Sequence, residues 1–479
     1  MEFFGREEII GHLNDLWGKS VSSFVTCRGR RRIGKSTLIE RFAEVSKARF
    51  IKIEGARPEK KKTDADERKA FAYQLRVQTG SEQSCPENWL DAFVRLAGVI
   101  KDDERTVVLL DEASWMGHYE PMFTDILKIA WDNYLKKHDR LVFVVCGSVS
   151  TWIKEAIVDN KAFYGRRSLD IIVPELPLRE CVKFWRGKAG QMATRELFDI
   201  LAVTGGVPRY LEEVNPSLSA QENLRRMCFI PKAPLREDFD EMFEDVITRQ
   251  STFTGKVLRS LVDGSMSVSA IANALGVEKG GNITAALDQL EEVGMVAADP
   301  GKNPQTGADV REKCYRLRDN YARFYLKYVE PRKDSIDGST FQFRGLEYFP
   351  GWNQVMGLAF ENLVVNHCRD LLKPLHLETA GVLSAAPYRR RGSQARGVRG
   401  CQIDLLIQMS SSLCVVEIKR MSRIGLEVIQ EVKDKVVALP CKSGVTLRTA
   451  LVYDGELDPA VETEGYFDAI VPFRSLMGL

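Results

Sequence analysis

The sequence predicts an α/β protein built on a parallel sheet, with further domains behind it. Three short apolar runs, at residues 23–27, 106–110 and 141–146, are each typical of a strand that is buried on both faces. Amphipathic stretches separate these runs, as the helices of a doubly wound sheet would. At 479 residues the chain is too long for one hydrophobic core, and the usual domain size predicts about three domains.

A glycine-rich, basic segment follows the first apolar run and leads into a helix expected over residues 36–45. The segment consists of Gly29, Arg30, Arg31, Arg32, Ile33, Gly34, Lys35, Ser36 and Thr37. Glycines at both ends let successive backbone N–H groups curl around phosphate oxygens. We expect Lys35 to reach the β- and γ-phosphates of ATP and Ser36 to bind Mg²⁺. The whole segment is therefore predicted to bind a nucleotide.

Polar residues follow the second and third apolar runs. Asp111 and Glu112 end the second run, where a parallel sheet would bring them beside the glycine-rich segment. We expect Asp111 to hold Mg²⁺ through water and Glu112 to polarise the attacking water. Ser148 follows the third run and is a candidate sensor of the γ-phosphate, with a simple turn residue as the alternative.

Three further motifs add a family resemblance over roughly residues 1–240. They are Met-Glu-Phe-Phe-Gly-Arg-Glu at 1–7, Tyr-Gly-Arg at 164–166 and Gly-Gly-Val-Pro-Arg-Tyr-Leu at 205–211. On these motifs the chain resembles the AAA+ and STAND-type ATPases, in particular their prokaryotic, archaeal-type branch. The resemblance implies an AAA+-like core at 1–175 and a helical lid at 176–245, hinged at Gly-Gly-Val-Pro. It makes Arg166 a candidate γ-phosphate-sensing or finger arginine, with an ordinary surface arginine as the alternative.

Residues 246–335 predict a winged-helix domain. Short amphipathic helices are expected at 256–262, 268–275 and 282–293, and a hairpin follows, with strands near residues 295–296 and 314–317. The third helix has few basic residues, which a helix that reads DNA normally offers. A spacer or protein-contact role and a DNA-reading role both remain open. The aromatic stripe at 315–325 is expected to be mostly core.

Residues 336–479 predict an α/β domain that contains a second chemical site. Two strands, at 402–407 and 413–419, form a hairpin on which Glu417 and Lys419 share one face. Asp404 can approach the same point across the hairpin, and Glu361 lies upstream in a helix expected at 358–368. Carboxylates that bind Mg²⁺, together with a lysine that positions water, are the groups that phosphodiester cleavage requires.

This arrangement resembles the PD-(D/E)XK nucleases, that is, a restriction-endonuclease-like domain. The resemblance implies that Asp404 and Glu417 bind Mg²⁺ or Mn²⁺, that Lys419 is the catalytic lysine and that Glu361 is the helix carboxylate. It also suggests Gln430 as a glutamine on the next helix. A degenerate domain that only binds is the alternative. The basic residues at 389–391, 396 and 399 are candidates for phosphate-backbone contacts.

Composition limits the remaining function classes. The 68 basic and 66 acidic residues nearly cancel, so only local clusters inform on nucleic acid. The ten cysteines are scattered without paired spacing, and no apolar stretch reaches bilayer length, so a cytoplasmic protein without a membrane partner is expected.

The leading hypothesis is an ATPase that regulates a Mg²⁺-dependent nuclease acting on nucleic acid, DNA rather than RNA. The alternative is a STAND-type signalling ATPase whose C-terminal domain only binds nucleic acid or protein. The oligomeric state is open, with a homo-oligomer as one outcome, because a finger arginine acts within one chain or between two.

Overall fold

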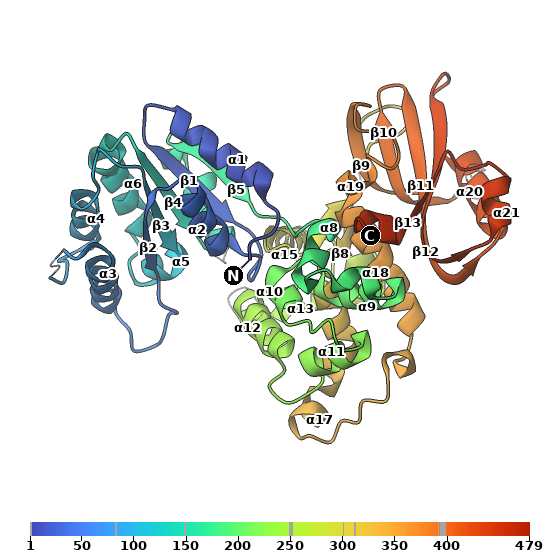
Figure 1. Ribbon diagram of the computed structural model, residues 1–479, viewed down its shortest axis with the longest axis horizontal. Coiled ribbons are helices and arrows are strands. Elements are labelled where there is room, and N and C mark those ends of the chain that lie inside the picture. Colours follow the sequence, from blue (N-terminus) through green and yellow to red (C-terminus); the bar gives the residue numbers. More distant parts are fainter. Residues whose placement is uncertain are drawn as a thin grey trace. The chain divides into compact units, whose positions relative to one another are not determined.

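The chain folds into two compact units, Met1–Glu175 and Leu176–Leu479, whose elements are labelled in Figure 1. The computed structural model describes residues 2–479 except 82–83, 148–149, 249–251, 300, 311–312, 391 and 393–398. The first unit ends at the residue where the ATPase core was expected to end. The segments expected to form the lid, the middle domain and the C-terminal domain lie together in the second unit.

The first unit is built on a five-stranded parallel sheet with the strand order β2-β3-β4-β1-β5. Its strands are β1 (Ser23–Arg28), β2 (Arg49–Glu54), β3 (Thr106–Asp111), β4 (Leu141–Cys146) and β5 (Arg167–Ile172). Every residue of β1, β3 and β4 is buried, which confirms the three apolar runs as central strands. Because the strands are parallel, the segments after β1 and β3 emerge at the same edge of the sheet.

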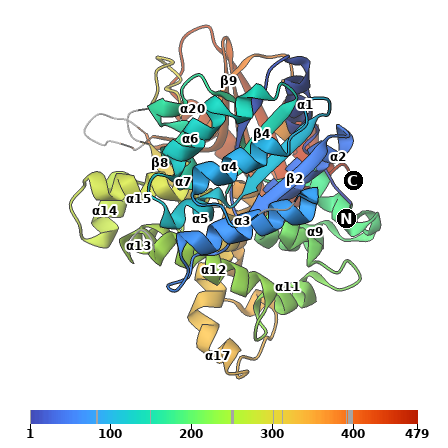
Figure 2. The same cartoon turned by 90° about the vertical axis from the view of Figure 1, so that its left-hand side faces the viewer.

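Helices cover both faces of this sheet. They are α1 (Glu7–Asp15), α2 (Lys35–Val45), α3 (Asp64–Thr79), α4 (Trp89–Gly98), α5 (Ala113–Met116), α6 (Phe123–Asn133) and α7 (Ser150–Ile153). Aromatic and aliphatic side chains of α3, α4 and α6 pack on one face, against Phe24 and Phe143, and Figure 2 shows these helices in front of the strands. The predicted α/β architecture around a parallel sheet is thus confirmed, and the glycine-rich loop follows β1 at one end of the sheet.

The second unit begins with helices and a small sheet. The helices are α8 (Leu178–Cys181), α9 (Thr194–Thr204), α10 (Pro208–Glu212), α11 (Ala220–Cys228), α12 (Pro234–Thr248), α13 (Thr252–Ser260), α14 (Val268–Leu275) and α15 (Gly281–Glu292). The antiparallel sheet β6-β8-β7 consists of β6 (Met266–Ser267), β7 (Val296–Asp299) and β8 (Cys314–Leu317). We call residues 252–317 the middle module. Its three helices and strand pair lie near the positions expected from the sequence.

An aromatic cluster joins the first helices of this unit to the segment after the middle module. On α16 (Asn320–Phe324), Tyr321 packs edge-on against Tyr210 and Phe324 packs against Phe229, and both α16 side chains are buried. The expectation that the aromatic stripe is mostly core is therefore confirmed. Two short helices, α17 (Lys333–Asp337) and α19 (Cys368–Leu371), flank the longer helix α18 (Trp352–Asn366).

The C-terminal part is a five-stranded mixed sheet with the order β13-β12-β11-β10-β9. Its strands are β9 (Val382–Arg390), β10 (Cys401–Met409), β11 (Ser412–Ile424), β12 (Thr446–Leu457) and β13 (Ala469–Pro472). The predicted hairpin is confirmed as the antiparallel pair β10–β11, whereas β11–β12 and β12–β13 are parallel. Helix α20 (Glu427–Ala438) makes the crossover from β11 to β12, and α21 (Pro459–Thr463) and α22 (Phe473–Leu476) complete the unit.

Candidate functional site

The loop between β1 and α2 has glycines where larger residues would be strained. The backbone at Gly29 has φ +145°, and a Cβ there would lie 2.8 Å from the carbonyl oxygen of Val173. Gly34 has φ +86° directly before α2 begins at Lys35. Both positions require the conformational freedom of glycine. The loop thus leads into a helix N-terminus, whose unpaired N–H groups and dipole favour a phosphate.

Lys35 lies inside this loop. Its Nζ donates hydrogen bonds to the carbonyl oxygens of Gly29 and Arg30, each at 3.1 Å, and the residue is buried. The ammonium group is therefore held at the centre of the loop, within reach of phosphates bound there.

The other nucleotide-binding candidates surround Lys35. They are Arg30 and Ile33, which are buried, Arg31, which is half-buried, and Arg32 and Thr37, which are exposed. The Ile33 carbonyl oxygen accepts a hydrogen bond from Nη2 of Arg6 at 3.3 Å. An arginine of the N-terminal motif thus supports the loop, a role that the sequence did not reveal.

Ser36 and Asp111 meet at the same edge of the sheet. The Ser36 hydroxyl donates to Oδ2 of Asp111 at 2.5 Å, although the two residues are 75 positions apart in the chain. A hydroxyl and a carboxylate oxygen are the hard donors that Mg²⁺ prefers. The residues therefore fit the predicted ion: Ser36 and Asp111 would hold it, and it would neutralise charge on the phosphates.

Lys52 is a residue of this site that the sequence did not suggest. Its Nζ lies 3.4 Å from Oδ2 of Asp111, because β2 pairs with β3 in register. Burial lowers the pKa of Lys52, but the negative charges of Asp111, Glu40 and Glu54 raise it by more. The pKa of Lys52 is therefore raised overall. The ammonium group therefore stays charged and balances the buried Asp111 carboxylate.

Glu112 occupies the turn directly after Asp111. Its φ of +50° is a left-handed conformation that side chains rarely adopt, and its carbonyl oxygen accepts from the Trp115 N–H at 2.8 Å. Gly55 packs so closely that a Cβ there would lie 2.6 Å from this carbonyl oxygen. The turn places Glu112 at the phosphate edge of the sheet. Ser148, the candidate sensor, lies outside the described residues.

The structure does not bring Arg166 to the P-loop of its own unit. Arg166 directly precedes β5, and Arg167 pairs with Phe24 at the start of β1, whereas the P-loop follows the end of β1. Five residues of strand separate the two ends by about 17 Å. Arg166 instead forms a two-pronged ion pair with Asp132, with both N–O distances 2.9 Å, and holds the pKa of Asp132 down at about 2. A role as a finger toward a second copy stays a prediction.

The second site lies on β10, β11 and α20. The Glu417 side chain is 1% exposed and is contacted by two lysines, with Lys419 Nζ 3.3 Å from Oε1 and Lys435 Nζ 2.5 Å from Oε2. Asp404 joins this group, since its Oδ2 accepts from the Ile418 N–H at 3.0 Å and its Oδ1 lies 3.8 Å from Lys435 Nζ. Asp404, Glu417 and Lys419 are thus brought together as expected.

Glu361 on α18 interacts electrostatically with this group of side chains. Burial and the negative charge of Asp404 raise the pKa of Glu361 to about 7. Burial and the charge of Glu417 raise the pKa of Asp404 to about 6. Three carboxyl groups in one buried region repel each other, so a cation or a proton stabilises them.

Lys435 lies between the two carboxylates that were expected to bind a metal. Among the described residues, no three Asp, Glu, His or Cys side chains are arranged to hold a metal ion. The oxygen donors of Asp404 and Glu417 nevertheless suit Mg²⁺ or Mn²⁺. They would hold such an ion in place of the Lys435 ammonium, and it would supply activated water and neutralise phosphate charge.

Gln430 does not face this site. It is exposed, and its Nε2 donates to Oδ1 of Asp434 on the outer side of α20 at 3.0 Å. The residues of α20 that reach the strands are Glu431, whose Oε2 lies 2.5 Å from Lys419 Nζ, and Lys435. The sequence carried a signal for both, because residues spaced by four positions share one face of a helix.

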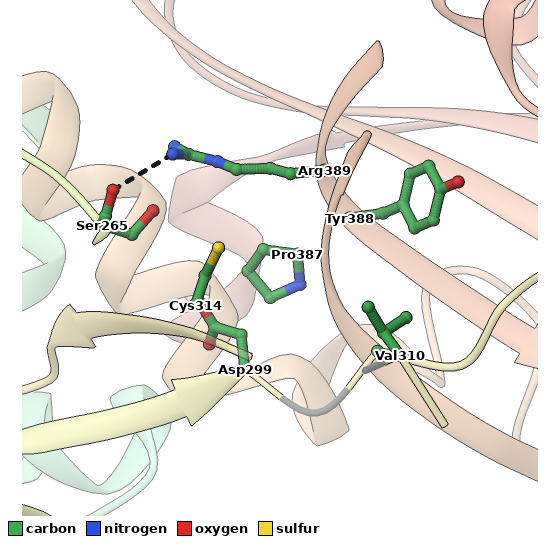
Figure 3. Close-up of a pocket in the computed structure, with 8 residues that line it drawn as sticks. Ser265, Asp299, Val310, Cys314, Pro387, Tyr388 and Arg389 are labelled. Atoms are coloured by element: carbon green, nitrogen blue, oxygen red, sulfur yellow. Dashed lines mark hydrogen bonds between the residues drawn. The ribbon is translucent and has the colours of Figure 1, made fainter. Parts of the chain in front are cut away.

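The basic stretch before β10 is only partly described. Arg389 and Arg390 belong to β9, and Nη2 of Arg390 donates to the carbonyl oxygen of Arg399 at 3.0 Å. Arg391 and Arg396 lie outside the described residues. The charge of Arg389 acts on Glu361 and lowers its pKa, against the larger raising effect of burial. Figure 3 shows the Arg389 side chain and the hydrogen bond that it donates to the middle module.

Comparison with known proteins supports an ATPase domain in the first part of the chain. Residues 3–214 match a family described as an ATPase domain predominantly from Archaea. The match supports an archaeal-type ATPase domain over these residues, and with it ATPase activity. The match extends beyond the first unit and includes α9 and α10 of the second.

Individual proteins also resemble the chain. An uncharacterized protein of Methanocaldococcus jannaschii, MJECL04, is 24% identical over 374 residues, which cover 78% of each chain. The Walker-type ATPase PABY2304 of Pyrococcus abyssi shares the fold at a TM-score of 0.50 and 15% identity, over 68% of this chain and 96% of that one. The ORC2 protein of Aeropyrum pernix gives a TM-score of 0.41 at 15% identity, over 70% and 93%. Within the described residues, no helix is long and apolar enough to cross a membrane.

The ATPase site predicts the effect of Asp111→Asn. Hydrolysis of ATP with Mg²⁺ should fall at least about 100-fold. The substitution removes the negative charge of a buried carboxylate that would position the Mg²⁺ ion. Phosphate release measures hydrolysis, and displacement of a fluorescent nucleotide without Mg²⁺ should change little. Asp125→Asn, on the exposed side of α6, is the matched control. Unchanged hydrolysis in Asp111→Asn would remove Asp111 from the site.

The raised pKa of Glu361 predicts a pH-dependent stability in metal-free buffer. The fold favours the protonated form, so the free energy of unfolding should fall as the pH rises from 4.5 to about 7. Glu361→Gln should remove the share of this loss that Glu361 contributes, at most about 3 kcal/mol at pH 8, whereas Asp404 and Asp199, whose pKa values are also raised, keep their shares. Urea unfolding with EDTA at pH 4.5 and pH 8 measures the effect, with the exposed Glu378→Gln as control. Equal pH dependence in Glu361→Gln and wild type would contradict the burial argument.

Proposed function

We propose that this ATPase uses its nucleotide state to regulate a Mg²⁺-dependent nuclease in its second unit, acting on DNA. The observation that carries the proposal is the meeting of Asp404, Glu417 and Lys419 at one buried point of the C-terminal sheet. Burying several charges is costly, so a sheet retains such a group where chemistry or binding requires it. Asp404 and Glu417 would hold the metal, and Lys419 would position the attacking water or neutralise charge.

The order of elements around this group supports the resemblance to PD-(D/E)XK nucleases. Helix α18, the antiparallel strands β9, β10 and β11, the crossover helix α20 and the parallel strand β12 follow one another along the chain. The carboxylates lie on the first helix and the two central strands of this arrangement. We also propose that the middle module is a winged helix, since its helices are followed by a strand pair of the expected kind.

A STAND-type signalling ATPase is the second candidate, and one observation favours it. Lys435 Nζ lies 2.5 Å from Glu417 and 3.8 Å from Asp404, which neutralises the carboxylates without a metal. In that case the C-terminal domain would bind nucleic acid or protein and would not cut it.

Contacts between α9 and the C-terminal sheet support regulation. The ATPase family match includes α9, and Asp199 on this helix lies 3.4 Å from Nη2 of Arg420 on β11. The Arg420 guanidinium also lies over the Phe198 ring, 4.2 Å from its centroid, and Nε of Arg420 lies 3.3 Å from Oδ2 of Asp454. Arg420 directly follows Lys419, and alternation puts the two on opposite faces of β11. A movement of α9 would thus shift Arg420 and, with it, the strand that carries the proposed catalytic lysine, Lys419.

The nuclease proposal predicts that Lys419→Ala abolishes cutting. Cleavage of labelled DNA with Mg²⁺ or Mn²⁺ should fall at least about 100-fold, because charge near the scissile phosphate is lost. Hydrolysis of ATP should stay unchanged. Gel assays of DNA and RNA substrates measure cleavage, and the exposed Lys442→Ala should cut like wild type. Cutting that survives Lys419→Ala would remove the assigned nuclease site.

The regulatory proposal predicts that Asp199→Asn weakens the response of cutting to ATP. Burial raises the pKa of Asp199 to about 6 even beside Arg420, so the amide should be tolerated without loss of the fold. The ratio of cleavage rates with and without ATP should move toward one, while metal-dependent cutting without ATP remains. The exposed Asp334→Asn is the control. An unchanged ratio in Asp199→Asn would exclude this contact as the route of regulation.

A further inference from the structure

Both oxygens of the Asp111 carboxylate have a hydrogen-bond donor. Oδ1 accepts a hydrogen bond from the Glu112 N–H at 3.2 Å, and Oδ2 accepts one from the Ser36 hydroxyl at 2.5 Å. The Lys52 ammonium lies 3.4 Å from the same Oδ2. An ammonium group has no lone pair and cannot bind a metal ion. Lys52 therefore contacts the carboxylate that would hold Mg²⁺ without being a ligand of the ion itself.

Lys52 reaches this carboxylate from strand β2. Ile51 and Ile53 of β2 are buried in the hydrophobic core, and alternation puts Lys52 and Glu54 on the other face of the strand. Pairing with β3 sets Glu54 opposite Asp111, two residues beyond Lys52. The fold thus holds the Lys52 side chain beside the end of β3.

Lys52 neutralises more than one carboxylate. Its Nζ also lies 3.3 Å from Oε1 of Glu40 on α2 and 3.9 Å from Oε2 of Glu54. Lys35, another ammonium group at this edge, donates to two carbonyl oxygens of the P-loop. Loss of the Lys52 charge would leave Asp111, Glu40 and Glu54 uncompensated. The electrostatic potential beside Asp111 would then become more favourable for a cation.

We propose that Lys52 is a positioning residue that weakens the hold of Asp111 on Mg²⁺ and so keeps the ion exchangeable between turnovers. The Asp111 side chain is 7% exposed, so water screens its interaction with Lys52 only in part. Product release limits the rate of many enzymes, and an ion held too tightly would delay the release of ADP. Neither Lys52 nor Asp111 belongs to the proposed nuclease site, so the nuclease proposal can fail without affecting this one.

Binding of Mn²⁺ tests the proposal without relying on hydrolysis. Mn²⁺ suits the same oxygen ligands as Mg²⁺, and electron paramagnetic resonance measures how much of it is free. With the protein loaded with one equivalent of ADP, Lys52→Met should bind Mn²⁺ more tightly than wild type, by about three-fold or more. Lys52→Arg keeps the charge and should bind Mn²⁺ like wild type.

A charge-matched variant separates the local contact from a change in net charge. Lys101 is exposed in the segment that leads into β3, and Lys101→Met removes one positive charge from the same unit. It should bind Mn²⁺ like wild type. The proposal would be overturned if Lys52→Met bound Mn²⁺ no more tightly than wild type, or if Lys101→Met bound it as tightly as Lys52→Met.

Glu40→Gln tests the same arrangement in the opposite direction. Without the Glu40 charge, Lys52 has one partner fewer besides Asp111, so Mn²⁺ binding should weaken by about two-fold or more. Glu40 is exposed, and the variant should keep the wild-type thermal unfolding midpoint, as should Glu44→Gln, the control on the same helix. If Lys52→Met does not fold, Glu40→Gln decides alone. Mn²⁺ binding that is unchanged or tighter in Glu40→Gln would contradict the proposal.

Discussion

The buried carboxylate of Glu417 is the group on which the arrangement of the second unit most depends. A carboxylate that is 1% exposed needs cations around it, and Lys419 and Lys435 supply them from β11 and α20. Lys435 also lies near Asp404, and Lys419 is paired with Glu431, so one buried charge fixes the register of two strands and a helix. Removing one partner would leave a buried charge uncompensated, at a cost of about 3 kcal/mol or more.

The same principle organises the first unit. Asp111 is buried at the edge of the parallel sheet and is balanced by the Ser36 hydroxyl and the Lys52 ammonium. In both units, a buried carboxylate on a largely apolar strand is paired with a lysine on a neighbouring element. Such preorganised charge is what phosphate chemistry needs, because it stabilises developing charge without rearrangement.

Strand β11 connects the two proposals. Its one face carries Glu417 and Lys419, and its other face carries Arg420, which contacts Asp199 and Asp454. Helix α9 thus contacts β11 on the face opposite Glu417 and Lys419. This helix belongs to the segment that the ATPase family match covers. Packed side chains therefore link α9, which the ATPase family match includes, to the strand of the second site.

Local patterns in the sequence predicted most of the fold. The buried strands β1, β3 and β4 were visible as apolar runs, and the β10–β11 hairpin was visible from alternation around a serine-rich turn. Residues that act through tertiary contacts were not visible. Lys52 reaches Asp111 only because β2 pairs with β3, and Lys435 reaches Glu417 only through the orientation of α20. Arg166 matched a motif, but it directly precedes β5. It therefore lies near the start of β1, at the end of the sheet opposite the P-loop. The assignments of Asp404, Glu417 and Lys419 to metal binding and catalysis stay predictions.

The measurement that tests the central claim most directly is DNA cleavage by wild type and Lys35→Ala, with Mg²⁺, in the presence and absence of ATP. The account predicts that both proteins cut, that ATP changes the wild-type rate several-fold, and that ATP leaves the Lys35→Ala rate unchanged. It would be contradicted if neither protein cut DNA, or if the rates of both proteins responded equally to ATP.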